Sequence, residues 1–159
     1  MEADPLSVGT GYEDFLTTVF STPIAGKAWL ASIAIALALV QITTAAGIYG
    51  KLAQILPFSA SSVARVHRWS GRTALIITLP IIFHCVFILG FQTSDLRVTI
   101  HSLAGTFLYG VFAAKVLFVR SRSYPGWVLP VAGGTLFSVL AVLWVTSGLW
   151  YFTHVRFGF

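Results

Sequence analysis

Four long apolar runs, separated by short polar segments, dominate the hydropathy pattern of this chain. They cover residues 28–49, 63–91, 98–119 and 129–153 approximately. A helix needs about 20 mostly apolar residues to cross a bilayer, and each run is long enough. Short connections make consecutive helices antiparallel. The pattern therefore predicts an all-α integral membrane protein, a four-helix up-down-up-down transmembrane bundle that occupies residues 28–159.

The segment before the first run, residues 1–27, has a different character. It carries acidic residues where a secretory signal peptide would be positively charged, so we do not interpret it as one. Apolar residues recur in it at helical spacing: Phe15, Leu16, Val19 and Phe20. We expect a short amphipathic helix on the membrane surface or against a partner. An ordered lead-in to the first span is the alternative.

Composition agrees with a membrane protein. Of the 159 residues, 57% are hydrophobic and 9% charged, whereas soluble domains have about 25% charged residues. The length leaves no room for a separate soluble catalytic domain. The single cysteine, Cys85, excludes an internal disulfide and a thiolate metal cluster. The pI of 9.8 does not indicate nucleic-acid binding, because basic loops set orientation in membrane proteins.

The loop charges predict the topology. The side reached after the first and third runs carries basic residues and no acid: Lys51, Arg65, Arg68, Arg72, Arg120 and Arg122. All five acidic residues fall on the opposite side. Basic loops stay in the cytoplasm. We therefore expect a multi-pass protein of a bacterial plasma membrane with both termini extracytoplasmic, and we call the two faces inner (basic) and outer (acidic).

The four histidines carry the candidate chemistry. His84 lies inside the second run, and an ionisable residue there is a functional hypothesis by default. His101 opens the third run and His154 closes the fourth, both towards the outer face, whereas His67 lies at the inner face. Histidines without a carboxylate cluster favour haem, held by imidazoles from facing helices. We expect His84 and His101 to ligate the haem iron, with His154 as a substitute and His67 a ligand only if a second haem exists.

Other residues near this pair have two interpretations each. Gly105 follows His101 by one helical turn, where it leaves room for a flat macrocycle or allows a close helix contact. Arg97 and Arg156, on the outer side, are placed to pair with haem propionates or with lipid headgroups and water. Pro80, four residues before His84, predicts a kink in the second helix.

Two short motifs resemble a known family. The stretch HRWSGR at His67–Arg72 precedes an apolar span with a second histidine, and His-x-x-x-Gly recurs at His101–Gly105. These motifs resemble the ferric-reductase-like transmembrane family of b-type cytochromes. The resemblance covers the second and third spans. It implies haem b held by histidines from two helices, and electron transfer through the membrane.

The chain departs from that family's pattern at the inner face. In the family the two histidines of one span are typically about fourteen residues apart, whereas His67 and His84 are seventeen apart, a rotation of about 100°. The position fourteen after His101 is Lys115. The resemblance therefore implies one haem pair, His84 with His101, and leaves His67 without a histidine partner at its depth. The flavin and nicotinamide domains of such reductases have no counterpart here.

The leading hypothesis is a membrane b-type cytochrome, an electron-transfer subunit or anchor of a respiratory or redox complex. It would hold one bis-histidine haem b near the outer face and would not be a complete enzyme. Expected partners are membrane lipid, other subunits, and a quinone or an extracytoplasmic electron carrier, but no nucleic acid. The alternative is a cofactor-free four-span accessory or assembly subunit. A small transporter is a weaker third hypothesis, because no paired broken helices or carboxylate relay are evident.

Overall fold

The computed structural model describes residues 10–11, 14, 17–52, 59–121 and 123–156, with only the backbone of Arg156. Its four long α-helices are α2 (Pro23–Ile48), α3 (Ala60–Phe83), α4 (Leu96–Ser121) and α5 (Val128–Trp144). The π-helical segment η1 (His84–Leu89) continues α3, and the π-helical segments η2 (Val145–Leu149) and η3 (Tyr151–Arg156) continue α5. No strand occurs in the described residues. The predicted all-α four-helix architecture is confirmed.

Local sequence signals explain where these helices begin and end. Thr22 caps α2 by accepting a backbone N–H bond, and Pro23 follows at the first helical position. Ser59 caps α3 in the same way. Gly90 ends η1 with φ +66°, a left-handed conformation that glycine adopts without strain. These caps set the register in which each apolar run faces its neighbours.

All four helices are long and apolar enough to cross a membrane. The spans that meet this criterion are Pro23–Ile48, Ala60–Leu89, Leu96–Ser121 and Val128–Val155, with peak mean hydropathies between 1.7 and 2.1. The amphipathic helix expected within residues 1–27 depends on Phe15 and Leu16, which lie outside the described residues.

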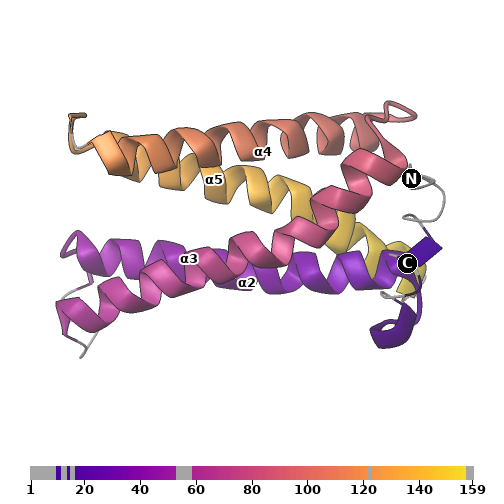
Figure 1. Cartoon of the computed structure of the whole chain (residues 1–159), viewed down its shortest axis with the longest axis horizontal. Helices are drawn as coiled ribbons and strands as arrows, with labels where there is room; N and C mark the ends of the chain where they lie inside the picture. Colours follow the sequence, from indigo (N-terminus) through magenta and orange to yellow (C-terminus); the bar gives the residue numbers. More distant parts are fainter. Residues whose placement is uncertain (1–9, 12–13, 15–16, 53–58, 122, 157–159) are drawn as a thin grey trace, which may run out of the picture.

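The helices are arranged as two hairpins. Figure 1 shows α2 beside α3 and α4 beside α5, and α2 also contacts α5, η2 and η3 and so joins the hairpins. The second half of α3, which contains Pro80, leaves α2 and rises towards α4. The start of α2, the end of η1, the start of α4 and the end of η3 share one end of the bundle, the outer end.

Small residues bring α2 close to the last span. Ala25, Ala28 and Tyr151 form the buried core cluster, with Phe152 packed against it. A Cβ on Gly148 would lie only 2.8 Å from the Trp144 ring, so glycine is required there. Small residues are typical of helix contacts in membranes, where they allow backbones to approach closely.

Most of the helix surface remains uncovered by the chain itself. At most 17% of the apolar window of each span is buried. The chain exposes 10397 Å², whereas a compact fold of 17.2 kDa exposes about 7,800 Å². These apolar surfaces need lipid, a cofactor or partner helices to cover them.

Candidate functional site

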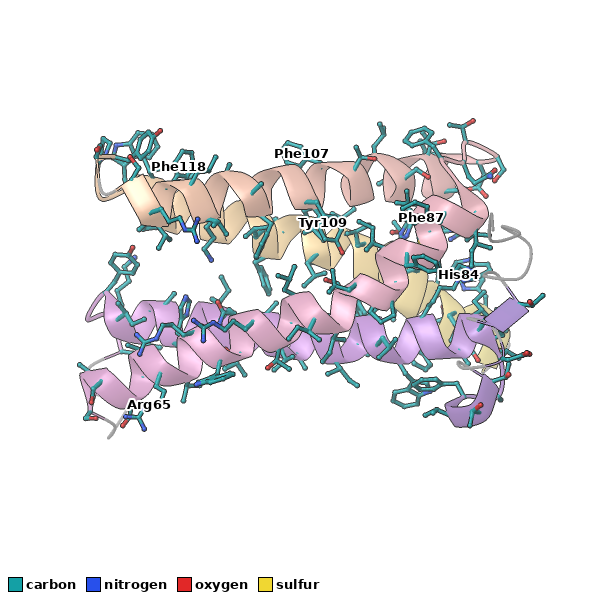
Figure 2. The ribbon with its side chains drawn as sticks, in the orientation of Figure 1. Arg65, His84, Phe87, Phe107, Tyr109 and Phe118 are labelled. Carbon is teal, nitrogen blue, oxygen red and sulfur yellow. The ribbon has the colours of Figure 1, made fainter. Side chains whose placement is uncertain are left out.

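His84 is the most buried polar side chain among the described residues, at 4% exposed. It stands at the junction between α3 and η1 (Figure 2), four residues after Pro80. Proline lacks the N–H that would continue the α-helical ladder, and π-helical turns in helices frequently accompany functional sites. The local sequence thus places a buried imidazole where the helix changes its geometry.

His101, in the second turn of α4, is held by Thr146 of η2. Its Nδ1 lies 2.9 Å from the Thr146 hydroxyl. That hydroxyl also lies 2.7 Å from the backbone carbonyl of Val142 and 3.2 Å from that of Leu143, and either carbonyl can accept its proton. With the hydroxyl donating to a carbonyl, Nδ1–H of His101 donates to the hydroxyl, and Nε2 keeps its lone pair. Metal-binding histidines are commonly oriented by such a bond from their other nitrogen.

Arg97 reinforces the same junction between α4 and η2. Its Nη1 donates to the backbone carbonyl of Thr146 at 2.7 Å, and its guanidinium lies 4.1 Å from the centre of the Trp150 ring. A carboxylate oxygen of Asp95 is 4.0 Å from Nη2. An arginine has five N–H donors, so further donors remain for an anion. The residue expected to pair with a propionate thus lies next to His101.

Lys27 is a member of this end that the sequence analysis did not single out. It belongs to the second turn of α2, and it acts electrostatically on His101 together with Arg97. Lys27 of α2, Arg97 and His101 of α4, and Thr146 of η2 thus lie at the same end of the bundle, the outer end. In the sequence, Lys27 could have been noticed as a lysine at the start of an apolar span. Its proximity to His101, however, follows only from the packing of α2 against the last span.

The remaining predicted residues are placed less centrally. His154 is exposed and stacks on Trp150, with ring centres 5.5 Å apart. It therefore lies at the surface of the outer end. Gly105 faces α5, where a Cβ would lie 3.9 Å from Leu143, an ordinary contact that leaves room for a methyl group. The side chain of Arg156 lies outside the described residues.

His67 lies at the inner end, away from the other three histidines. Its Nδ1 is 2.9 Å from the hydroxyl of Thr44 on α2, which donates to the carbonyl of Val40 at 2.6 Å. Gln41 bonds the His67 carbonyl and the Ser70 hydroxyl. These contacts bind α2 to α3, and they give His67 a structural role.

No group of three or more His, Cys, Asp or Glu side chains converges within the described residues. The bis-histidine site predicted from the sequence would need only two such side chains, His84 and His101. The structure brings both residues to the outer end from different spans.

One apolar groove, of about 380 Å³, lies between α4 and α5 at the inner end, away from these histidines. It is lined by Val111, Ala114, Phe118, Tyr124, Trp127, Val128, Val131, Ala132 and Thr135.

Residues 8–159 match the model of a family of unknown function, DUF6529. The chain belongs to this family. The match covers the whole described bundle, so the four spans and the outer-end cluster are parts of one family unit. No curated protein and no solved structure matches the chain. The family description assigns no chemistry, and function must be argued from the side chains.

Proposed function

We propose that this member of DUF6529 is a membrane b-type cytochrome, the electron-transfer subunit or anchor of a redox complex. One haem b would lie towards the outer end, with His84 and His101 as the axial ligands. The observation that supports the proposal is the bond between His101 and Thr146 within a membrane span, because an Nδ1–H donor in that bond leaves the Nε2 lone pair to a ligand.

The donor set fits haem b. Two neutral imidazoles from different helices are a usual axial pair for haem in helical bundles. His84 is 4% exposed, which agrees with a ligand that is kept from water. Lys27 and Arg97 supply positive charge beside His101, where two carboxylates would need it.

Each residue has a stated task in this proposal. Thr146 holds the proton of His101 on Nδ1, so that Nε2 stays unprotonated and its ring orientation is fixed. Arg97 and Lys27 neutralise the charge of carboxylates that approach the outer end. His84 supplies the second imidazole from the π-helical junction. Haem, when bound, would supply a one-electron Fe(III)/Fe(II) couple whose potential depends on these ligands and charges.

The proposal extends to partners and location. A single site near the outer end can exchange electrons with a quinone or an extracytoplasmic carrier, but it does not by itself span the membrane. The chain would therefore act within a larger complex of a bacterial plasma membrane, in contact with lipid and other subunits, with both termini extracytoplasmic. The basic inner turns support that orientation.

A second candidate is a cofactor-free accessory or assembly subunit. The observation that favours it is that the same polar side chains also form hydrogen bonds between helices. His101 and Arg97 both bond Thr146, and His67 bonds Thr44, so each of these side chains also binds one helix to another. Interhelical hydrogen bonds of this kind stabilise membrane bundles without any cofactor.

An absorption spectrum of the purified chain separates the two candidates. The cytochrome should show a Soret band when oxidised and sharp α and β bands after reduction with dithionite. The protein should be expressed with added haem precursor, so that cofactor supply does not limit loading. A homogeneous, folded preparation without these bands would reject the cytochrome and leave the accessory subunit.

A further inference from the structure

Two hydrogen-bonded ties join the second span to the third. In the outer tie, the hydroxyl of Ser102 on α4 donates to the backbone carbonyl of Gln92 at 2.9 Å, and the backbone N–H of Gln92 donates to that hydroxyl at 3.3 Å. In the inner tie, the hydroxyl of Tyr109 on α4 donates to the backbone carbonyl of Thr78 on α3, at 3.4 Å (Figure 2). Ser102 and Tyr109 are seven residues apart, so they lie on one face of α4.

The outer tie reaches the end of η1 through the side chain of Gln92. Its Nε2 donates to the carbonyl of Leu89, the last residue of η1, at 2.6 Å. The last carbonyls of a helix have no partner within the helix, so this bond fixes the turn to the helix end. Ser102 fixes the same turn to α4. The segment that begins at His84 is thus fastened to the residue that follows His101.

These hydrogen bonds matter because the two helices that they join pack little against each other. Among the described residues, α2 packs against α3 and α4 against α5, whereas α3 and η1 make no extensive backbone contact with α4. Figure 1 shows that only the second half of α3 rises towards α4. The two ties and the short turn are therefore placed to set the separation of the second and third spans.

Both predicted haem ligands lie close to these ties. Along the second span, His84 lies between Thr78 and Gln92, and along the third, His101 directly precedes Ser102. At a rise of about 1.5 Å per residue, each histidine is within about 12 Å of a tie along its own helix. A change in the separation of the two spans would therefore move one imidazole relative to the other.

We propose that Ser102 and Tyr109 are positioning residues, which set the separation of His84 and His101 for the axial haem pair. The inference rests on the proposed function, because it concerns the same two imidazoles. Neither hydroxyl is a ligand, and both act through the helices that they join. Ligands of a bound group must be held within about 0.5 Å of their productive geometry, which two loosely packed helices cannot ensure without such ties.

Distance measurements on the full chain without haem test the ties themselves. Spin labels would be attached at two exposed positions, Val86→Cys on η1 and Leu103→Cys on α4, in a Cys85→Ser background. Dipolar electron paramagnetic resonance should give one narrow distance distribution. Ser102→Ala and Tyr109→Phe should each broaden it, because each removes one hydroxyl and little else. An unchanged distribution in one variant would remove that residue's role, and an unchanged distribution in both would overturn the inference.

Thr106→Val is the matched control. The Thr106 hydroxyl donates to the backbone carbonyl of Ser102 at 3.0 Å, a bond within α4 itself. The variant should therefore keep the narrow distribution of the parent chain. Broadening equal to that of Ser102→Ala would mean that the loss of any hydroxyl on α4 loosens the hairpin, and it would overturn the specific role of the ties.

Haem titration supplies the second readout. Ser102→Ala and Tyr109→Phe should each lower haem affinity about 2–10-fold, the effect of one lost hydrogen bond. The resonance spectrum of their oxidised haem should be broader than that of the parent, because the two imidazole planes no longer have one relative orientation. Thr106→Val should match the parent in both measurements.

The two ways of failing are distinguishable. A folded, haem-supplied parent chain that binds no haem would reject the proposed function. A haem-binding parent whose Ser102→Ala and Tyr109→Phe variants keep its affinity and its spectrum would reject only the positioning role.

Discussion

The position of one proton on His101 governs the chemistry available to it. With the Thr146 hydroxyl donating to the carbonyl of Val142, Nδ1–H of His101 donates to the hydroxyl, and Nε2 keeps the lone pair that the proposed haem site requires. A hydroxyl of η2 therefore controls an imidazole of α4, although the two residues lie 45 positions apart in the sequence.

Thr146→Val should weaken haem binding without removing either histidine. Valine keeps the shape of threonine but has no acceptor for the Nδ1 proton. Loss of such an orienting bond typically lowers metal affinity about 10–100-fold, and we expect a decrease of that size in haem affinity. Haem titration of the apoprotein would measure it. Thr146→Ser should bind like the parent chain, and Thr44→Val makes the same change at the inner end as a control. If the parent chain binds haem and Thr146→Val binds it equally well, Thr146 has no orienting role.

Removing the histidines one at a time tests the ligand assignment. His84→Ala and His101→Ala should each abolish stoichiometric haem, because each removes one of two axial imidazoles. His67→Ala should keep most of it, since His67 lies at the other end of the bundle and bonds Thr44. Haem per protein after purification is the measurement. Retention of haem by His84→Ala would transfer the ligand role, with His154 the first residue to examine.

The sequence indicated some of these residues and not others. Histidines within or beside apolar runs stand out because ionisable groups are rare there, and His84, His101 and Arg97 were selected for that reason. Thr146 and Lys27 were not selected, because a threonine or a lysine near the end of a span is ordinary. Their relation to His101 depends on how α2 and η2 pack against α4, which no local pattern contains.

At the level of helices, the apolar runs predicted the four spans well. The length of each apolar run and the polar segments between the runs can be read from the sequence alone. The predicted bounds of the spans therefore lie close to those of α2, α3 with η1, α4, and α5 with η2 and η3. The π-helical segments η1, η2 and η3 were not predicted. Pro80 indicated a disturbance before His84, but the type of hydrogen bonding that follows depends on tertiary packing. Two of the residues of the candidate site, His84 and Thr146, lie in the π-helical segments η1 and η2.

Gly148→Ala should loosen the contact between α2 and the last span. The new Cβ would lie 2.8 Å from Trp144, whose ring nitrogen bonds Ser32 of α2 at 3.0 Å, and 3.5 Å from the carbonyl of Ala28. Overpacking of this kind typically costs about 1–3 kcal/mol in the free energy of unfolding. Denaturation in detergent would measure it. Gly110→Ala has nothing within 4 Å and should not destabilise, so equal stability of the two variants would contradict the packing described.

At the scale of the whole molecule, the charge distribution and the helix order make a joint prediction. An even number of spans places both ends of the chain on one side, and basic turns favour the cytoplasm. Reporter fusions at Phe159 and within the turn at residues 121–127 should therefore report opposite sides, with the turn inside. Reporters on the same side would contradict the four-span topology.

The distribution of the histidines sets how many haems one chain can hold. Three histidines lie towards the outer end and one at the inner end, where Lys115 is the nearest candidate partner. A bis-histidine site needs two imidazoles at similar depth. Only the outer end can therefore form a bis-histidine pair from this chain alone.

Haem stoichiometry tests the central claim most directly. Pyridine-haemochrome absorbance of the purified full chain, divided by protein concentration from amino-acid analysis, gives haem per chain. We predict a value near one, which falls to near zero in His101→Ala. A value near zero in a folded, haem-supplied preparation would contradict the cytochrome. A value near two would contradict the single outer site and would make His67 a ligand.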